Sequence, residues 1–484
     1  MIQPVDSRLL WQIETDLSKP LVIGTGNVLY LHGWCYHPFR RIKRLSILVD
    51  GAPHPVSNFS LLREDVLRAH FGTLDLKGNS LHSGFWVMIP FAKIDSERQV
   101  RLDLKAELSG GETCEPSIGW LILEPALPLL IHEFPAGLAS ERTPLVAICM
   151  ATYNPPLEYF RRQIDSILHQ SYTNWVCIIN DDCSKPEIFE QMQAIVGLDE
   201  RFKMFRNVFN LGFYYNFERC LSYVPAQASL VALSDQDDIW HRDKLSTLLS
   251  QFDEETLLVY SDMNIVNEKE ETIHSTYWTT RRNNYTDLGL LMLANTVTGA
   301  ASIFCRGLLK LLLPFPERIG DAYHDNFIAC VALSLGKIKY VDSPLYDYRQ
   351  HSANIFGHKV HGKRTLSHFL RKFRRNKMLR NFIRDFKQIL LNYRSVYYHD
   401  YIRRVLLAHV LNLRCPSVTK EKKRIIRKFV GLEFGISALA LEVLKNKIFQ
   451  KGRVTVGNDV QLLKSVLSTK LINYVGRLKQ HREK

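Results

Sequence analysis

Apolar residues in the first 140 positions of this 484-residue chain come in short, partly alternating runs of the kind that form β-strands. Such runs occur at residues 28–31, 45–49, 84–89 and 100–104. Turn-forming pairs such as Asp50-Gly51 separate the runs, and no helical period competes with them. The pattern predicts a β-sandwich-like accessory domain over residues 1–140. This domain can serve as a packing or spacer unit, with carbohydrate binding as the alternative.

From about residue 144 the pattern changes to strand-like apolar runs that alternate with amphipathic helical stretches. Strands are predicted at residues 146–151, 175–179, 202–205, 230–233 and 257–260, and helices at residues 213–223 and 244–252. This alternation predicts an α/β domain over residues 141–358, in which helices flank a mostly parallel sheet. Polar loops follow several of the strands and meet at the sheet edge where open α/β sheets bind their ligands.

A basic helical region is predicted for residues 359–484. It carries 31 Lys and Arg against 7 Asp and Glu, a net charge of +24, whereas the rest of the chain carries 32 against 42, a net charge of −10. An apolar stripe at helical spacing comprises Leu379, Phe382, Phe386, Ile389, Tyr393 and Tyr397. This stripe can pack on the protein's own domains or lie on an anionic membrane surface. Nucleic-acid binding is disfavoured, because no RRM, helix-turn-helix or zinc pattern accompanies the charge.

The cysteines and the apolar segments bear on the compartment. The nine cysteines are scattered and show no CxxC or zinc-type spacing, which suits a reducing compartment. The N-terminus has no signal-peptide pattern, and the stretch nearest to a membrane span, residues 429–444, contains Glu433 and Glu442. We expect a cytoplasmic protein, which the basic region could hold at the inner face of the cell membrane.

An acidic segment, Ser234-Asp235-Gln236-Asp237-Asp238-Ile239-Trp240, directly follows the apolar run at residues 230–233. Its three carboxylates are therefore expected in the loop at the carboxyl end of a buried strand. Clustered carboxylates repel one another, and Mg²⁺ or Mn²⁺ relieves this repulsion because such ions take oxygen ligands, often together with substrate phosphates. The alternative is a solvated acidic turn in which Asp237 or Asp238 caps the next helix.

Further polar motifs occur in a fixed order along the α/β part of the chain. They are Met150-Ala151-Thr152-Tyr153-Asn154, Asp181-Asp182-Cys183-Ser184, Asn210-Leu211-Gly212, the acidic segment, Gly299, Tyr323-His324-Asp325-Asn326 and Tyr348-Arg349-Gln350-His351. This series resembles family 2 of the inverting glycosyltransferases, which have the GT-A fold. Cys183 stands where the family has a glycine, and His324 where it often has a glutamate. The closing motif is similar to that of rhamnosyltransferase-like members, which build bacterial surface polysaccharides.

The resemblance implies a role for each motif. The donor-binding residues would be Thr152, Tyr153, Asn154, Asp181, Asp182, Asn210, Gly212, Asp235 and Arg349. The ligands of a Mg²⁺ or Mn²⁺ ion would be Asp235, Asp237 and His351. The acceptor-side residues would be Gly299 and His324. For Arg349, a salt bridge within the fold is the competing interpretation.

The chemistry of glycosyl transfer requires the same kinds of group, namely ligands for a divalent ion and a base. Loss of a nucleoside diphosphate develops negative charge on the leaving oxygen, which a divalent ion stabilises. The attacking hydroxyl needs a base, and Asp325 is the candidate. The predicted function is metal-dependent, inverting transfer of a sugar, with L-rhamnose favoured, from a nucleotide-diphosphate sugar to a glycan or lipid-linked acceptor. The alternatives are an inactive sugar-binding relative and a basic nucleic-acid-binding protein.

Overall fold

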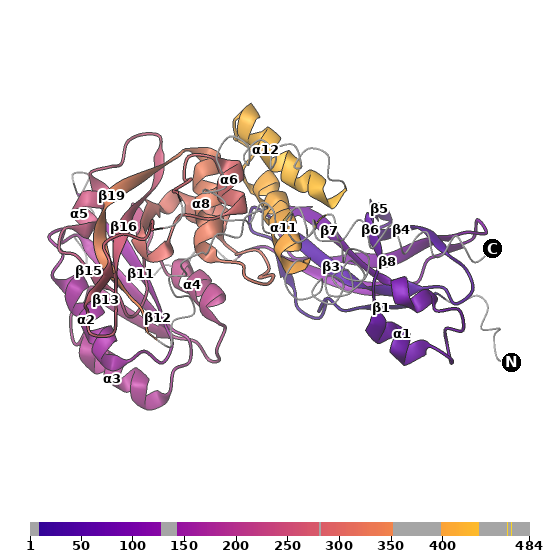
Figure 1. The fold of residues 1–484 in the computed structure, drawn as a ribbon, viewed down its shortest axis with the longest axis horizontal. Coiled ribbons are helices and arrows are strands. Elements are labelled where there is room, and N and C mark those ends of the chain that lie inside the picture. Colours follow the sequence, from indigo (N-terminus) through magenta and orange to yellow (C-terminus); the bar gives the residue numbers. More distant parts are fainter. Residues whose placement is uncertain are drawn as a thin grey trace, which may run out of the picture.

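The computed structural model describes residues 9–126, 143–279, 282–351 and 398–434, together with Leu462 and Val466. Figure 1 shows two sheet-based units at opposite ends of an elongated molecule. Helices α11 (Tyr398–Arg414) and α12 (Lys420–Val430) lie where the two units meet.

The N-terminal unit consists of two packed sheets. The first has the strand order β1 (Leu10–Ile13), β3 (Gly26–Tyr36), β7 (Gly84–Ala92) and β6 (Asn58–Leu61). The second has the order β2 (Leu21–Val22), β10 (Ser117–Glu124), β8 (Arg98–Leu108), β4 (Ile42–Val49) and β5 (Ala52–Pro55), with β9 (Thr113–Cys114) beside β8. The pairs are antiparallel except β10 with β2. The expected sandwich is confirmed, and the four apolar runs lie in β3, β4, β7 and β8.

Strands β3 and β7 are buried on both faces. Because alternate residues of a strand face opposite sides of its sheet, Leu29 points into the core between the two sheets while Tyr30 points the other way. On that second face, Trp86 of β7 meets Tyr401 of α11 edge-on, with ring centroids 5.6 Å apart. The first sheet is thus covered by the second sheet on one side and by α11 on the other.

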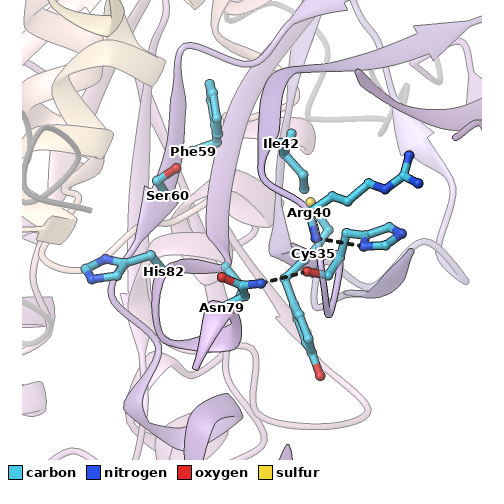
Figure 2. A pocket seen from close by; sticks show the side chains of 10 residues that line it. Cys35, Arg40, Ile42, Phe59, Ser60, Asn79 and His82 are labelled. Carbon is cyan, nitrogen blue, oxygen red and sulfur yellow. Dashed lines mark hydrogen bonds between the residues drawn. The ribbon is translucent and has the colours of Figure 1, made fainter. Parts of the chain in front are cut away.

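A small pocket lies inside the N-terminal unit, between β3, β6 and the 3₁₀ turn η2 (Asn79–His82), which together with α1 (Glu64–His70) connects β6 to β7 (Figure 2). Its volume is about 20 Å³. Asn79 fixes one side of it by donating from Nδ2 to the carbonyl oxygens of His37 and Pro38, at 3.1 and 2.9 Å. A space of this size holds one water molecule, so this pocket is not a carbohydrate-binding site.

The second unit is built on a mixed sheet. Its strand order is β13 (Phe202–Arg206), β12 (Trp175–Asp181), β11 (Val146–Thr152), β14 (Leu230–Ser234), β18 (Ser302–Cys305), β16 (Thr256–Val266), β19 (Lys337–Arg349) and β15 (Ile239–Trp240), with β17 (Thr272–His274) beside β16. Strands β13, β12, β11 and β14 are parallel, as are β16 and β19, whereas β18 and β15 run antiparallel to their neighbours. The mostly parallel sheet is confirmed, and the five predicted strands lie in β11, β12, β13, β14 and β16.

Helices pack against this sheet. They are α2 (Leu157–Leu168), α3 (Pro186–Val196), α4 (Phe213–Ser222), α5 (Lys244–Leu249), α6 (Leu288–Leu293), α7 (Leu309–Leu312) and α8 (His324–Leu335). Helix α2 shows the reason: Phe160, Ile164 and Ile167 recur every three or four residues and are all buried, so one stripe faces the core. The helices predicted at residues 213–223 and 244–252 are α4 and α5, and α5 ends at Leu249, three residues earlier than expected.

Helices α11 and α12 are the described part of the basic C-terminal region. Buried Arg414 donates from Nε to the carbonyl of Gly26 in the sandwich at 2.7 Å, and from Nη1 to the carbonyls of Leu312 and Pro314 in the α/β unit at 3.0 and 2.7 Å. One guanidinium group therefore satisfies backbone acceptors of both units. The apolar stripe between Leu379 and Tyr397 lies outside the described residues. Among the residues that are described, no helix combines the length and apolar content that a membrane crossing requires.

Candidate active site

A cavity of about 1000 Å³ opens at the carboxyl ends of β11, β12 and β14. It is lined by twelve of the residues predicted from the motifs, namely Thr152, Tyr153, Asn154, Asp182, Asn210, Gly212, Asp235, Asp237, Gly299, His324, Asp325 and His351. Asp181 and Arg349, which were also predicted, are absent from the lining. Residues of α11 contribute to the same cavity, although the sequence placed them in a separate region.

Asp181 lies beneath the cavity floor. Its carboxylate is fully buried and accepts hydrogen bonds from Thr152 Oγ1 at 3.2 Å, Ser184 Oγ at 2.5 Å and the Ser184 backbone N–H at 2.8 Å. These bonds connect the loop after β12 to the end of β11. In this structure Asp181 therefore positions the two loops that could meet a nucleotide, rather than facing the cavity itself.

Asp182 organises the next loop along the chain. Its carboxylate accepts from the backbone N–H groups of Leu211 and Gly212, each at 2.8 Å, and from Asn207 Nδ2 at 2.9 Å. Gly212 has a φ of 79° and directly precedes α4, so this turn uses the conformational freedom of glycine. Asp182 thus fixes the segment that brings Asn210 to the cavity wall.

The loop after β12 keeps a left-handed residue although it lacks the family's glycine. Cys183 has a φ of 62°, a conformation in which a side chain is strained by about 1–2 kcal/mol. Asn154 opposite it also has a positive φ, 41°, and accepts from the Lys185 N–H at 3.0 Å. The backbone shape that the glycine would favour is therefore present with cysteine in its place.

The acidic loop after β14 faces the cavity with Asp235 and Asp237. Burial raises the pKa of Asp235, and the nearby Asp237 and Asp325 carboxylates raise it further. Asp237 Oδ2 lies 2.7 Å from Nε2 of His351, which comes from the segment after β19. Residues more than a hundred positions apart therefore meet at this loop.

The donor atoms of this loop suit a hard divalent ion bound together with a diphosphate. Among the described residues, no group of three or more His, Cys, Asp or Glu side chains forms a metal site by itself. Asp235 and Asp237 nevertheless offer carboxylate oxygens, and Mg²⁺ is commonly held by one or two carboxylates plus substrate phosphates. The repulsion that raises the pKa of Asp235 is also what a cation would relieve. The residues present therefore fit the ion.

Arg349 is a support for the acidic loop. Its guanidinium is 1% exposed, pairs with Glu270 Oε1 at 3.0 Å and donates from Nε to the Asp237 carbonyl at 3.1 Å. It also stacks on Tyr159, 4.3 Å from the ring centroid. Asp238 lies in the same buried layer, where its Oδ1 accepts from the Arg349 N–H at 3.4 Å. The structure thus shows the salt bridge within the fold that was the competing interpretation of Arg349.

Lys244 is a buried charge near the acidic loop that the motifs did not indicate. Burial lowers the pKa of its amine, and the Asp238 and Asp235 carboxylates oppose that shift. The only signal in the sequence is position: Lys244 lies four residues before Leu248 and so shares the buried face of α5. The Nζ atom donates to the carbonyl of Ala300 at 2.5 Å and lies 3.8 Å from the centroid of the Trp240 ring.

Asp325 and His324 begin α8 on the other side of the cavity. Burial raises the pKa of Asp325 to about 7, while hydrogen bonds from the backbone N–H groups of Asn326 and Gly299 act in the opposite direction. His324 stacks on Phe217 with ring centroids 4.0 Å apart, and burial lowers its pKa to about 3. The imidazole is therefore neutral, and the carboxylate beside it titrates near neutrality.

Gly299 leaves no room for a side chain. A Cβ atom at this position would lie 3.0 Å from His324 Nε2 and 3.6 Å from Asp325 Cβ. Because the tight contact is with His324, we expect Gly299→Ala to shift His324, to disturb the adjacent Asp325 through it, and to lower the turnover number by roughly 10- to 100-fold. Steady-state transfer assays measure the turnover number of the variant.

A matched control exists for that substitution. Gly307 has open space around its Cβ position, so Gly307→Ala should leave turnover unchanged. Calorimetric titration of the nucleotide should give the same affinity for both variants. Equal turnover of the Gly299 and Gly307 variants would contradict the crowding argument.

Known proteins define the class of the α/β unit. Residues 147–312 match the family model described as Glycosyl transferase family 2, so the chain contains a domain of this family with a GT-A-like α/β fold. The match includes the loops after β11, β12 and β14 and ends before Asp325 and His351. The motif-based prediction of the family is confirmed at this level, and the rhamnosyltransferase-like subgroup stays a prediction.

Curated relatives share the same segment. The chain is 34% identical over 106 residues to the putative teichuronic acid biosynthesis glycosyltransferase TuaG of Bacillus subtilis. The aligned segment covers 22% of this chain and 41% of the relative. It is 35% identical over 112 residues to the putative colanic acid biosynthesis glycosyl transferase WcaA of Escherichia coli, covering 23% and 38%. It is 29% identical over 124 residues to UDP-Glc:alpha-D-GlcNAc-diphosphoundecaprenol beta-1,3-glucosyltransferase WfgD of E. coli, covering 25% and 47%. The chain thus spans less than half the length of each of these relatives.

Two solved structures are distantly similar. The crystal structure of S. aureus TarS 1-349 in complex with UDP has a TM-score of 0.39 and 15% identity, covering 69% of this chain and 91% of that one. The mannosyltransferase PcManGT from Pyrobaculum calidifontis, in complex with GDP-Man and Mn²⁺, has a TM-score of 0.34 and 16% identity, covering 71% and 90%.

Proposed function

We propose that this protein is a metal-dependent, inverting glycosyltransferase that uses a nucleotide-diphosphate sugar and a glycan or lipid-linked acceptor. The observation that carries the proposal is a single cavity, at the end of a family 2 domain, that joins the loops around Asp182, the carboxylates of Asp235 and Asp237, and Asp325. The relatives named for teichuronic acid, colanic acid and diphosphoundecaprenol-linked sugars support bacterial surface polysaccharide as the product.

Asp325 is the general base in this proposal. A carboxylate with a pKa of about 7 accepts a proton more readily than an ordinary aspartate and is still substantially ionised near neutral pH. It would remove the proton of the acceptor hydroxyl as the oxygen attacks the anomeric carbon. Attack on the face opposite the departing nucleotide inverts that centre in one displacement.

The acidic loop is the phosphate side of the proposed site. Asp235, Asp237 and His351 would hold Mg²⁺ or Mn²⁺. When bound, the ion supplies Lewis-acid stabilisation of the negative charge on the leaving diphosphate. The chain's own contribution is to hold the acidic loop in place through Arg349, which donates to the Asp237 carbonyl, and to place the Lys244 amine near the Asp235 carboxylate.

For the donor, we propose a dTDP- or UDP-linked sugar, with L-rhamnose as the first to test because of the Tyr348-Arg349-Gln350-His351 motif. Half-exposed Tyr153 and the loop at Asn154 would receive the base and ribose. The experiment is a screen of nucleotide sugars with the purified full chain, in which metal-dependent release of the nucleoside diphosphate is measured. Absence of release from every donor, with and without acceptor extracts, would overturn the proposed function.

We also propose that residues 359–484 hold the protein on an anionic membrane surface. Within the described part, Lys423, Arg424 and Arg427 expose a basic face of α12, while Phe429 on the opposite face packs inward. Each basic residue near an anionic leaflet contributes about 1 kcal/mol. Changing the three exposed residues to Gln should therefore reduce co-sedimentation with anionic vesicles, most clearly at low salt. Unchanged pelleting, or equal pelleting with neutral vesicles, would contradict the membrane role.

A further inference from the structure

Helix α11 forms part of the cavity wall beside the candidate base. Arg403, Arg404, Leu406 and Leu407 line the cavity together with Asp325. Arg403 Nη1 donates to the carbonyl of Asp321, four residues before Asp325, so this guanidinium is tied to the segment that leads into α8. Helix α11 lies outside the residues 147–312 that match the family model.

Arg403 has hydrogen-bonding capacity that the protein does not use. Its Nε and Nη2 donate to Asp400 Oδ1 at 3.0 and 2.6 Å, and its Nη1 donates to Asp321. A guanidinium has five N–H groups, so two of those on the Nη atoms have no partner among the described residues. The side chain is 24% exposed and lines the cavity.

The neighbouring charges do not cancel Arg403. Asp400 is shared between Arg403 and the buried Arg404, so one carboxylate faces two guanidinium groups. Arg318 adds a further cation nearby: it stacks on Phe213, 4.6 Å from the ring centroid, and Phe213 stacks in turn on Tyr323. Glu317 and Asp325 also line the cavity, and burial raises the pKa of each to about 7, so these carboxyl groups are partly protonated near neutral pH.

We propose that Arg403 binds a phosphoryl group of the acceptor, at a subsite between α11 and the start of α8. This inference rests on the proposed function, because it takes the hydroxyl beside Asp325 to belong to the acceptor. Free guanidinium donors match phosphate oxygens, and an ionised acceptor makes such hydrogen bonds stronger. Leu406 and Leu407 give the same wall an apolar surface. The phosphoryl group could belong to a lipid-linked diphosphate or to a phosphodiester of a glycan.

The test is a binding titration with two probes, farnesyl diphosphate and inorganic pyrophosphate, on the full chain in EDTA. EDTA removes the ion through which the donor side would hold a diphosphate. We expect Arg403→Gln to weaken the binding of farnesyl diphosphate roughly tenfold or more. Arg403→Lys keeps the charge without the planar donors, so its affinity should lie between those of wild type and Arg403→Gln. Arg98→Gln removes the same charge from an exposed position on β8 of the sandwich and should bind like wild type.

The outcomes distinguish a lipid-linked phosphoryl group from one without lipid. They also distinguish failure of the subsite from failure of the proposed function. Dependence on Arg403 for farnesyl diphosphate alone assigns a lipid-linked acceptor, and equal dependence for pyrophosphate assigns a phosphoryl group without lipid. Wild-type affinity of Arg403→Gln for both probes, or an equal loss in Arg98→Gln, would overturn the subsite. The unfolding temperature of each variant shows whether the substitution destabilises the packing of Asp400 with Arg404. Mn²⁺-dependent binding of UDP or dTDP, measured on the same preparations, tests the proposed function independently.

Discussion

Replacing Asp325 by Asn is expected to abolish sugar transfer while nucleotide-sugar affinity stays near that of wild type. The amide cannot accept the proton of the acceptor hydroxyl, and loss of a general base typically costs roughly 10²–10⁴-fold in rate. The proposed donor contacts lie on the opposite loops, so donor binding should be spared. Single-turnover transfer and calorimetric donor titration measure the two effects separately.

Asp321→Asn is the matched control, because Asp321 is exposed and Arg403 donates to its backbone carbonyl, which the substitution keeps. This variant should transfer sugar at the wild-type rate. If donor affinity falls in parallel with rate in Asp325→Asn, then Asp325 belongs to the donor side. Near-normal turnover would exclude it as the base.

The same residue predicts the pH dependence. Burial raises the pKa of Asp325 to about 7, and only the ionised form can act as a base. The value of kcat/KM should therefore rise as the pH increases through about 7 and level off above it. A profile that is flat across the neutral range, with chemistry shown to be rate-limiting, would contradict the assignment.

The second large effect is expected at Asp237. Asp237→Asn removes one negative charge from the acidic loop but keeps the size of the side chain, so the fold should persist while transfer is almost completely lost. The reason is that Mn²⁺ and a diphosphate would share this carboxylate. Calorimetry should show that Mn²⁺ no longer enhances the binding of UDP or dTDP.

Asp243→Asn makes the same change at an exposed position just before α5 and should preserve both metal enhancement and transfer. Unchanged Mn²⁺–nucleotide binding in Asp237→Asn would remove Asp237 from the metal site. A comparable loss in Asp243→Asn would point to general charge effects instead.

Local patterns along the chain were sufficient for much of this fold. Apolar runs located β11, β12, β14 and the main sandwich strands, because each strand is buried and bounded by turns. They could not reveal that β15 pairs with β19, since that contact joins Trp240 to Tyr346 across a hundred residues. The insertion of antiparallel β18 into a parallel sheet is likewise a property of the tertiary pairing.

Motifs predicted the position of the loops of the candidate site more reliably than the role of each side chain. Twelve predicted residues line one cavity, yet Asp181 and Arg349 lie beneath it. A motif gives the position of a residue in sequence, whereas burial depends on which neighbours close over it. For the same reason Lys244 and Arg403 went unnoticed, because their roles arise from packing against distant segments.

The double-sided burial of β3 and β7 has a consequence for how such a protein could evolve. Trp86 and Tyr30 are covered by α11, and Arg414 binds the carbonyl of Gly26. The N-terminal unit and α11 therefore bury apolar surface of one another. Recombination that exchanged the N-terminal unit alone would leave an apolar face of α11 in water. We therefore expect the N-terminal unit and α11 to be inherited together, although the family 2 domain lies between them in the sequence.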